Sequence, residues 1–459
     1  MRFRTAPKSG GNVVDRGKLS AAFMGEVEKF KEMHPNSARH FEESKKSLLS
    51  GVPMAWMNRW PGPHPIFAES ASGATVTDVD GHQYIDFALG DTGAMVGHTP
   101  VYLSELIQRQ VKTAITTMLP SSDAVWVASE LTRRFSLPKW QFAMTATDAN
   151  RFALRLARHV TGRSRILVFD WCYHGTVDET LVTLDADGKV VPREGNLGPG
   201  FKVEESTRVV QFNDLEALER ELAHGDVAAV LAEPALTNIG IVLPEAGFHD
   251  GLRRLTKKYG TLLIIDETHT ICVGPGGYTA AHGLEPDMLT IGKPIGGGFP
   301  AAAFGVSAEL EERLRPTLED ESIDVSGIGG TLTGNALAVA AMKVTLSNSL
   351  LESDFAVSGP LAKSWAEGVQ TTIDRHDLPW SVQNLGSRSE YWFCPAPSNG
   401  AQAAAAVDLE LDRYFHLFAL NRGILLTPFH NMALFSPKHT PKDVQAHTGV
   451  FSETVESIL

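Results

Sequence analysis

The chain has 459 residues, 43% of them hydrophobic, so it can bury a large core and divide into a major and a smaller domain. Its 54 acidic residues outnumber 41 basic ones, and the net charge of −13 argues against a nucleic acid or an anionic membrane bound through bulk charge. The three cysteines form no CxxC pair and no apolar run reaches the roughly 18 residues of a membrane span, so we expect a cytoplasmic protein without a disulfide framework, a zinc site or a membrane segment.

The first predicted elements are helices and a hairpin. The residues before Phe41 are polar and helix-prone, and the Pro/Gly-rich residues 60–65 mark an irregular crossing. Residues 75–87, with the sequence TVTDVDGHQYIDF, place two strand-like stretches around an Asp-Gly turn. This pattern predicts a β-hairpin.

Between residues 140 and 305, short apolar runs alternate with helical segments, a pattern typical of a parallel sheet with helical crossovers. The helix expected over Phe248–Tyr259 has its leucines on one face and ends at Gly260. The candidate buried strands are residues 165–170, 227–233, 261–266 and 288–292.

A long apolar helix is expected over residues 336–346, and the more polar region after it suits a second, α+β domain. The sequence has no internal repeat and no heptad array. Solenoid and coiled-coil folds are therefore excluded.

Ionisable residues follow three of the apolar runs directly. Glu233 comes after AAVLA, Asp266 after LLII, and Lys293 after MLTIG, with a glycine cluster just beyond the lysine. Ligand-binding groups of open α/β sheets gather at the carboxyl ends of the strands, and burial of a charge there is costly unless a partner compensates. Each residue alone could be a surface turn or a solvated loop charge. Their order along the chain favours a site.

A lysine and a carboxylate in this arrangement suit pyridoxal 5'-phosphate (PLP). Desolvation at a strand end favours the neutral, nucleophilic form of a lysine, as a Schiff base requires. A carboxylate such as Asp266 would keep the pyridine nitrogen of PLP protonated, and the protonated ring is the electron sink of the cofactor. Lys293 and Asp266 would then serve one cofactor from opposite ends.

Two further segments are candidate cofactor contacts. Residues 145–150 open an amphipathic helix, so the amides of Ala146 and Thr147 could bind a phosphate, although an ordinary N-cap explains the same residues. Tyr173, followed by His174 and a glycine, offers a ring for stacking; a buried core tyrosine is the alternative.

At this point the sequence resembles the class III (ω-type) PLP aminotransferases of fold type I, within them the branch of glutamate-1-semialdehyde 2,1-aminomutases and β-amino acid aminotransferases. LLIIDETHT followed by GLEPDMLTIGKPIGGGFPAAAFG carries the resemblance most specifically, and it extends from about Gly51 to the C-terminus. It implies an α/β fold with a mixed, mainly parallel sheet and a smaller α+β domain. Residues 86–335 would form the large PLP-binding domain, and residues 1–85 and 336–459 the small one.

The resemblance also implies roles for individual residues. Lys293 matches the Schiff-base lysine and proton shuttle, and Asp266 the partner of the ring nitrogen. Thr331 matches a threonine that reaches the phosphate from the neighbouring subunit, which implies a homodimer. The other implied cofactor contacts are Ala146 and Thr147 at the phosphate, Tyr173 and His174 at the ring, and Glu233, Asn238 and Thr268 nearby.

Several positions depart from the family pattern. Ala146 stands where the phosphate turn usually has glycine, and Thr268 where a valine packs under the ring. No convincing match exists for the arginine that binds substrate carboxylates in ω-amino acid aminotransferases. Arg59 lies roughly where related branches keep a substrate-binding arginine, but a surface arginine stacked on Trp60 is an equal alternative, and Arg388 and Arg422 are weaker candidates.

The reaction implied is transfer of an amino group from an amino acid or amine donor to a keto acid or aldehyde acceptor. A 2,1-aminomutase, or a PLP isomerase or racemase, is the alternative within PLP chemistry, and a catalytically silent homologue also stays open. A nicotinamide dehydrogenase lacks support because no strand is followed by GxGxxG, and a P-loop protein because Gly292 and Lys293 precede a proline.

Overall fold

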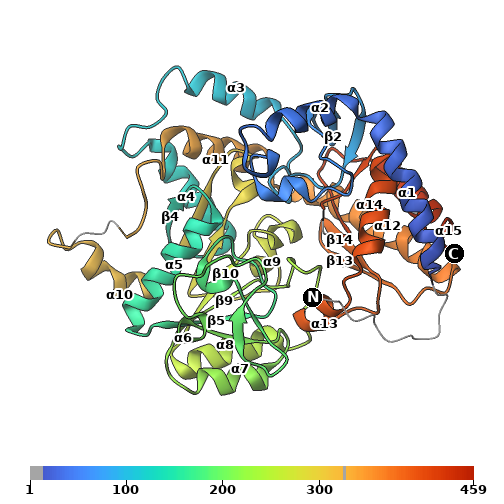
Figure 1. Cartoon of the computed structure of the whole chain (residues 1–459). Coiled ribbons are helices and arrows are strands. Elements are labelled where there is room, and N and C mark those ends of the chain that lie inside the picture. Colours follow the sequence, from blue (N-terminus) through green and yellow to red (C-terminus); the bar gives the residue numbers. More distant parts are fainter. Residues whose placement is uncertain (1–13, 324–326, 429) are drawn as a thin grey trace. The chain divides into compact units, whose positions relative to one another are not determined.

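The computed structural model describes residues 14–323, 327–428 and 430–459 (Figure 1). The packing of Cα atoms divides the chain into two units, each discontinuous in sequence. Unit 1 contains the chain up to Pro100, Ala356–Ala396 and Ala405–Leu459; unit 2 contains Val101–Phe355 and Pro397–Ala404. Within the described ranges, no helix is both long and apolar enough to cross a membrane.

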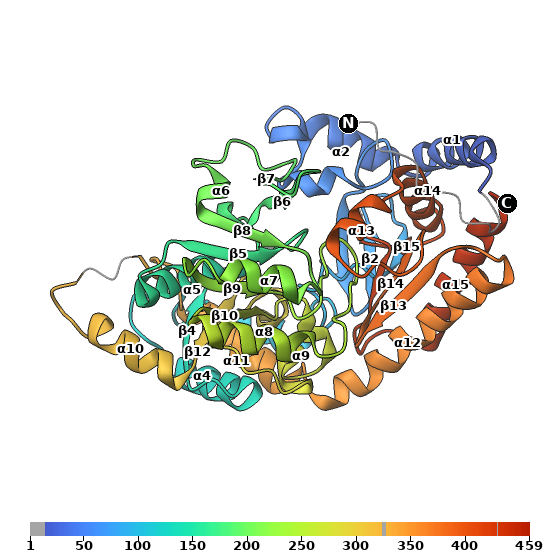
Figure 2. The same cartoon turned by 90° about the horizontal axis from the view of Figure 1, so that it is seen from below.

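The described part of unit 2 is built on a seven-stranded sheet in the order β4-β12-β11-β10-β9-β5-β8. Figure 2 labels β10, β9, β5 and β8 of this sheet. All neighbours pair in parallel except β12, which is antiparallel to both β11 and β4. The predicted mixed, mainly parallel sheet is therefore confirmed. Its strands are β4 (Lys139–Ala143), β5 (Arg165–Phe169), β8 (Thr207–Val210), β9 (Val227–Ala232), β10 (Leu262–Asp266), β11 (Met288–Ile291) and β12 (Ala302–Val306).

Helices cover this sheet because its central strands are apolar throughout: every residue of β9, β10 and β11 is buried. Helix α8 spans Phe248–Tyr259, as predicted, and ends at Gly260 with φ +60°. The other helices of unit 2 are α3 (Val101–Gln110), α4 (Ser122–Phe135), α5 (Ala146–Thr161), α6 (Val203–Ser206), α7 (Leu215–Leu222), α9 (Gly277–Ala281), α10 (Ala308–Leu318) and α11 (Ala336–Asn348). The short elements of unit 2 are η3 (Asp178–Thr180), β6 (Val182–Leu184), β7 (Val190–Pro192), η4 (Thr270–Val273), η5 (Lys293–Gly296) and α13 (Gly400–Ala405), whose last residue belongs to unit 1.

Unit 1 combines segments from both halves of the chain. The predicted hairpin is confirmed as β2 (Thr75–Asp78) and β3 (Gln83–Asp86), and β15 (Ile424–Leu425) pairs in parallel with β3. A second sheet has the order β13-β14-β16. The remaining elements are α1 (Arg16–Met33), α2 (Pro35–Ser44), η1 (Leu49–Gly51), η2 (Ala55–Asn58), β1 (Ala68–Ser72), α12 (Glu352–Arg375), which begins in unit 2, β13 (Ser381–Leu385), β14 (Arg388–Trp392), α14 (Leu409–Leu420), β16 (Met432–Leu434) and α15 (Pro441–Glu456).

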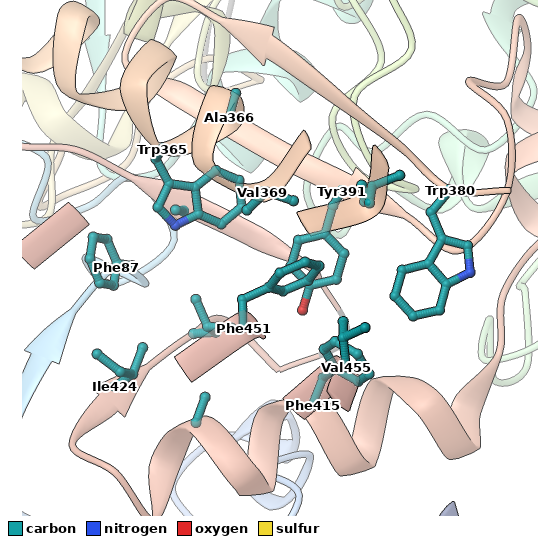
Figure 3. Close-up of a cluster of buried hydrophobic side chains, with 14 of the residues drawn as sticks. Phe87, Trp365, Ala366, Val369, Trp380, Tyr391, Phe415, Ile424, Phe451 and Val455 are labelled. Atoms are coloured by element: carbon teal, nitrogen blue, oxygen red, sulfur yellow. The ribbon is translucent and has the colours of Figure 1, made fainter. Parts of the chain in front are cut away.

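Aromatic side chains dominate the core of unit 1 (Figure 3). Tyr391 and Phe451 have ring centroids 4.9 Å apart, and Phe415 lies 5.5 Å from Phe451. His447 packs against Trp365 at 4.8 Å. Such pairs add stability beyond their buried area, so they hold together segments that are distant in sequence.

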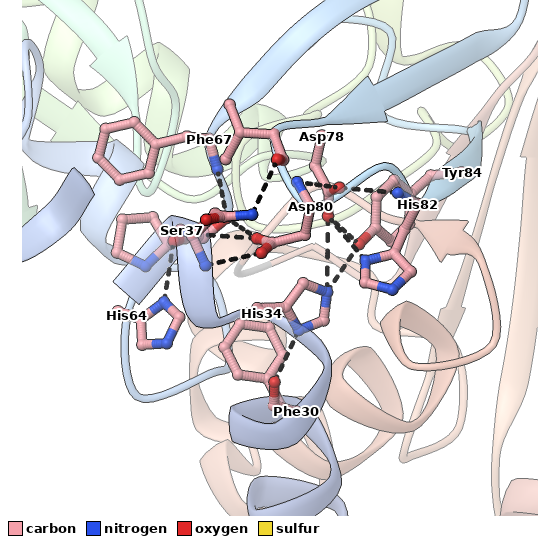
Figure 4. A network of polar contacts seen from close by, with 12 residues as sticks. Phe30, His34, Ser37, His64, Phe67, Asp78, Asp80, His82 and Tyr84 are labelled. Carbon is pink, nitrogen blue, oxygen red and sulfur yellow. Dashed lines mark hydrogen bonds and ion pairs between the residues drawn. The ribbon is translucent and has the colours of Figure 1, made fainter. Parts of the chain in front are cut away.

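A buried polar network connects the hairpin to the end of α1 (Figure 4). Tyr84 donates its hydroxyl proton to Asp78 Oδ2 at 2.6 Å, and His34 Nε2 lies 2.8 Å from the same hydroxyl. Asp78 Oδ1 accepts the backbone N–H groups of Asp80 and His82, which closes the Asp-Gly turn. The turn residues predicted from sequence are thus fixed by their own carboxylate.

Candidate active site

The three ionisable strand ends lie at one edge of the unit 2 sheet. Strand β10 is hydrogen-bonded to β9 on one side and to β11 on the other, all in parallel. Asp266 pairs in register with Thr290, two residues before Gly292 and three before Lys293. Glu233 follows β9 directly. The structure therefore brings together the residues that the sequence placed after separate strands.

Asp266 is a buried carboxylate with three hydrogen-bond donors around it. His174 Nδ1 donates to Oδ2 at 3.0 Å, Asn150 Nδ2 to Oδ2 at 2.8 Å, and the Thr268 N–H to Oδ1 at 3.1 Å. Burial opposes the charged form, but contact with His174 lowers the pKa of Asp266 to about 2. The carboxylate is therefore ionised at neutral pH and suited to face a protonated nitrogen.

His174 is held in the opposite charge state. Burial disfavours its imidazolium, but the neighbouring Cys172 and Asp266 side chains raise the pKa of His174 to about 10. The imidazole is completely buried, so it neutralises Asp266 without contact with solvent. Its assignment as a cofactor contact stays a prediction; in the structure its Nδ1 contacts the carboxylate of Asp266.

Asn150 is a member of the site that sequence reasoning missed. Its Nδ2 donates to Asp266 Oδ2 and to the carbonyl of His174, and its Oδ1 accepts the Thr290 hydroxyl at 2.7 Å. It thus connects helix α5, the His174 loop and strand β11. An amide side chain on the otherwise apolar buried face of α5 was the signal for this role.

Lys293 begins the short helix η5 with a left-handed backbone, φ +50°. That conformation is costly for a residue with a β-carbon and concentrates at functional sites. The half-buried Lys293 places its Nζ 2.7 Å from Nε2 of His269, which comes from the turn after β10. His269 was also missed from sequence, although it lies within the DETHT motif.

The start of helix α5 provides a site for an anion. The helix begins at Ala146, and the Thr145 hydroxyl caps it by accepting the Asp148 N–H at 3.2 Å. The N–H groups of Ala146 and Thr147 belong to the first turn, where the helix dipole favours negative charge. Ala146 has a β-carbon where the phosphate turn usually has glycine. The structure has room for it because residue 292 is glycine: a β-carbon on Gly292 would lie 3.0 Å from the β-carbon of Ala146.

The Tyr173 loop packs closely against the same helix start. Gly175 has φ +78°, and a β-carbon on it would overlap the Thr147 hydroxyl, which accepts the Thr176 N–H at 3.1 Å. Tyr173 is half-buried, and its N–H donates to Glu233 Oε1 at 3.2 Å. The loop that carries the aromatic ring is therefore fixed at both ends.

Two of the predicted cofactor contacts, Glu233 and Asn238, accept hydrogen bonds from or donate them to backbone groups near Tyr173. Glu233 Oε2 accepts the N–H of Thr237 at 3.2 Å, and burial raises the pKa of Glu233. Asn238 Nδ2 donates to the carbonyl of Trp171 at 3.2 Å. Both side chains therefore connect the loop after β9 to the loop that carries Tyr173.

The remaining predicted residues have different surroundings. Thr268 is buried two residues after the end of β10, whereas Thr331 is exposed. Arg59 is exposed at the end of η2 in unit 1, so its role stays a prediction. The weaker arginine candidates are engaged elsewhere in unit 1: Arg388 is buried beside Glu390, and Arg422 pairs with Glu26.

Residues 56–386 match the family model described as aminotransferase class III. A glutamate-1-semialdehyde 2,1-aminomutase of Desulfitobacterium hafniense is 34% identical over 390 residues, 83% of this chain and 89% of that protein. A solved structure described as a glutamate-1-semialdehyde aminomutase from Pseudomonas aeruginosa PAO1, in complex with PMP, is 47% identical with a TM-score of 0.95, covering 97% of this chain and 100% of that one. An ω-transaminase from Sphaerobacter thermophilus is 27% identical with a TM-score of 0.82, covering 92% and 97%.

Proposed function

The chain belongs to the class III aminotransferase family, and from this we propose that it transfers an amino group from an amino acid or amine donor to a keto acid or aldehyde acceptor. One observation carries the proposal: strands β10 and β11 pair in register, so the ionised Asp266, at the end of β10, lies beside the end of β11, which Lys293 follows two residues later. Transfer of an amino group needs both an amine that can be displaced and a carboxylate that holds a ring proton.

The cofactor is PLP. When bound, it supplies an aldehyde that links to amines and a protonated ring that withdraws electrons from the reacting carbon. The donor set of this chain fits both parts. Asp266 would hold the proton on the ring nitrogen, and Tyr173 would stack on the ring.

Lys293 would carry the cofactor and move the reacting proton. Its Nζ is a primary amine on a half-buried side chain, and the left-handed backbone at this position fixes the direction in which the side chain leaves η5. When Lys293 is not linked to the cofactor, its Nζ would take a proton from the reacting carbon of the substrate and return it to another atom of the substrate or cofactor.

The phosphate would bind at the start of α5, through the N–H groups of Ala146 and Thr147. We propose that Thr331 of the partner subunit completes this site in a homodimer; the exposure of Thr331 in the single chain supports that role. Glu233, Asn238, Thr268 and His174 would position the groups that touch the cofactor, and Arg59 would bind a substrate carboxylate.

A 2,1-aminomutase is the second candidate, because the names of the similar proteins favour it. The proteins from Desulfitobacterium hafniense and Pseudomonas aeruginosa both carry that description. Such an enzyme would use the same carboxylate and lysine, but its net reaction moves the amino group to another carbon of the same substrate. The two candidates differ in whether a separate acceptor molecule takes up the amino group.

Isotopic labelling separates the candidates. The PLP-loaded protein is incubated with a nitrogen-labelled amino donor and a separate keto acid or aldehyde, over a panel of both, and with labelled glutamate 1-semialdehyde alone. Label on the separate acceptor supports the aminotransferase. Conversion of labelled glutamate 1-semialdehyde into the isomer with its amino group on carbon 1, with no label on any separate acceptor, supports the aminomutase. Neither result, in protein that binds PLP at Lys293, contradicts both.

A further inference from the structure

His269 lies directly beside the amine of Lys293. Its Nε2 is 2.7 Å from Lys293 Nζ, although the two residues follow different strands. A contact of this length between two nitrogens requires a shared proton, because one nitrogen must donate and the other must accept. Two adjacent cations would repel each other, so the geometry favours one proton shared between the two nitrogens.

Hydrogen bonds fix the turn that carries His269. The carbonyl of Glu267 accepts the Ile271 N–H at 2.9 Å, and the buried Glu267 carboxylate accepts the Thr270 hydroxyl at 2.6 Å. His269 lies between these two anchors. A nucleophile within 2.6–3.2 Å of an oriented base is the arrangement by which proteins activate an amine or hydroxyl.

The carboxylates of Asp266 and Glu267 accept hydrogen bonds from other groups. Asp266 accepts hydrogen bonds from His174 and Asn150. Glu267 accepts the N–H groups of Tyr278 and Thr279 at the start of α9. Titratable groups on the elements that carry or pack against the pair are Glu267 in the turn after β10, Cys272 in η4, Tyr278 in α9 and Lys343 in α11. Asp266 at the end of β10, Glu233 after β9 and His174 in the loop after β5 lie at the same edge of the sheet.

We propose that His269 is a proton carrier for Lys293. An N–H bond of the Lys293 ammonium breaks, its electron pair stays on Nζ, and the proton forms an N–H bond at Nε2 of His269. The reverse transfer restores the ammonium. The inference rests on the proposed function, because a base for Lys293 matters only if that amine reacts. It adds a second titrating group to a reaction in which sequence comparison assigned only the lysine.

The test measures the amine itself and does not depend on turnover. Cofactor-free, full-length protein is acetylated with a limiting amount of acetic anhydride at a series of pH values, and modification of Lys293 is quantified by peptide mass spectrometry. His269→Gln keeps a polar side chain but cannot carry a proton in this range. His269→Asn is a second variant, and His224→Gln, at an exposed histidine of unit 2, is the control.

In the wild type, the acetylation profile should show an inflection in the range where imidazoles titrate. Both His269 variants should lose it and react on the order of tenfold more slowly near neutral pH. The absorbance of the PLP-loaded protein should lose the same pH-dependent step. Variant profiles that superimpose on the His224→Gln control would overturn the inference.

This result is separable from failure of the proposed function. If borohydride fixes PLP to Lys293 in the wild type but the His269 variants behave like the control, only the proton-carrier role is wrong. If borohydride leaves Lys293 unmodified in PLP-loaded wild type, the proposed function itself is wrong. Thermal unfolding of each variant identifies one that does not fold, and the remaining variant then decides.

Discussion

His174 Nδ1 donates a hydrogen bond to Asp266 Oδ2 at 3.0 Å, and the two side chains form a buried ion pair. The pKa of Asp266 is lowered from 3.8 to about 2, so its contribution to stability is lost as the pH falls through that range. The pKa of His174 is raised from 6.5 to about 10, so its contribution is lost as the pH rises toward 10. The pair therefore stays charged over the whole neutral range.

His174→Gln should move the acid limb of the pH–activity profile upward. Without the imidazolium, burial of Asp266 is unopposed, and its carboxyl should take up a proton about 1–3 pH units higher than in the wild type. A pH series of turnover in wild type and variant measures the shift. Asp266→Asn is the control: it should retain PLP but lose about 10²–10⁴-fold in turnover at every pH.

Lys293→Ala should lose both turnover and the covalent link to PLP. Borohydride treatment of PLP-loaded wild type should add the mass of the reduced cofactor to the peptide that contains Lys293, and the variant should show no such peptide. Lys258→Ala removes an exposed lysine of unit 2 that pairs with Glu219, and it should behave like the wild type. A labelled lysine elsewhere in the wild type would contradict the assignment.

Gly175→Ala should weaken PLP binding and destabilise unit 2. The added β-carbon would overlap the Thr147 hydroxyl, and the residue would also be strained at φ +78°. Gly225→Ala is the matched control, because Gly225 has φ +71° but open space around it. We expect about 1 kcal/mol of destabilisation for the control and about 1–3 kcal/mol more for Gly175→Ala in urea unfolding. Equal losses would show that the close packing is unimportant.

Mixed dimers test the role proposed for Thr331. Lys293→Ala and Thr331→Ala chains are expressed separately and together. If Thr331 of the partner subunit reaches the phosphate, a mixed dimer contains one site with both wild-type residues and should regain about half of wild-type activity. Mixed dimers no more active than the Thr331→Ala homodimer would place the threonine in its own subunit's site, or in none.

Acid should destabilise unit 1 through its buried histidines. Burial lowers the pKa of His447 to about 3 and of His416 to about 4, below the unfolded value of 6.5. The unfolded chain therefore takes up protons first, and stability should fall as the pH drops below 6.5. Burial raises the pKa of Asp412 to about 7, so protonation of this carboxyl favours the folded state as the pH falls and opposes the effect of the histidines.

His447→Leu should reduce this pH dependence by up to about 1.4 kcal/mol per pH unit. Urea unfolding at several pH values between 7 and 4 measures the slope. Phe451→Leu disturbs the same core without removing a titrating group, so it should lower stability by a similar amount at each pH. A His447→Leu slope equal to that of the wild type would contradict the neutral state of the buried imidazole.

Local patterns in the sequence predicted much of this fold. The buried strands are continuous apolar runs between turn residues, and helix α8 has an apolar face and a terminal glycine, so each signal is contained in a short segment. The direction of β12 and the pairing of β15 with β3 were not predicted, because both depend on contacts between distant segments. The domain boundaries drawn from sequence, the homodimer and the cytoplasmic location stay predictions.

The site was predictable where a residue type alone suggests chemistry. Lys293 and Asp266 could be chosen because charge after an apolar run is unusual. Asn150 and His269 could not, since their roles depend on side-chain contacts across the sheet edge. The sequence revealed the loss of glycine at Ala146, but only the structure shows that Gly292 provides the missing space.

The parallel pairing of β3 with β15 has a consequence for synthesis on the ribosome. The strands of the seven-stranded sheet of unit 2 all lie within the continuous stretch Val101–Phe355. This sheet can therefore assemble while translation continues. The hairpin of unit 1 leaves the exit tunnel early but waits for Ile424 and Leu425 to occupy its open edge. During that interval the edge of β3 is exposed to wrong partners, and nascent chains would need protection until the last segments emerge.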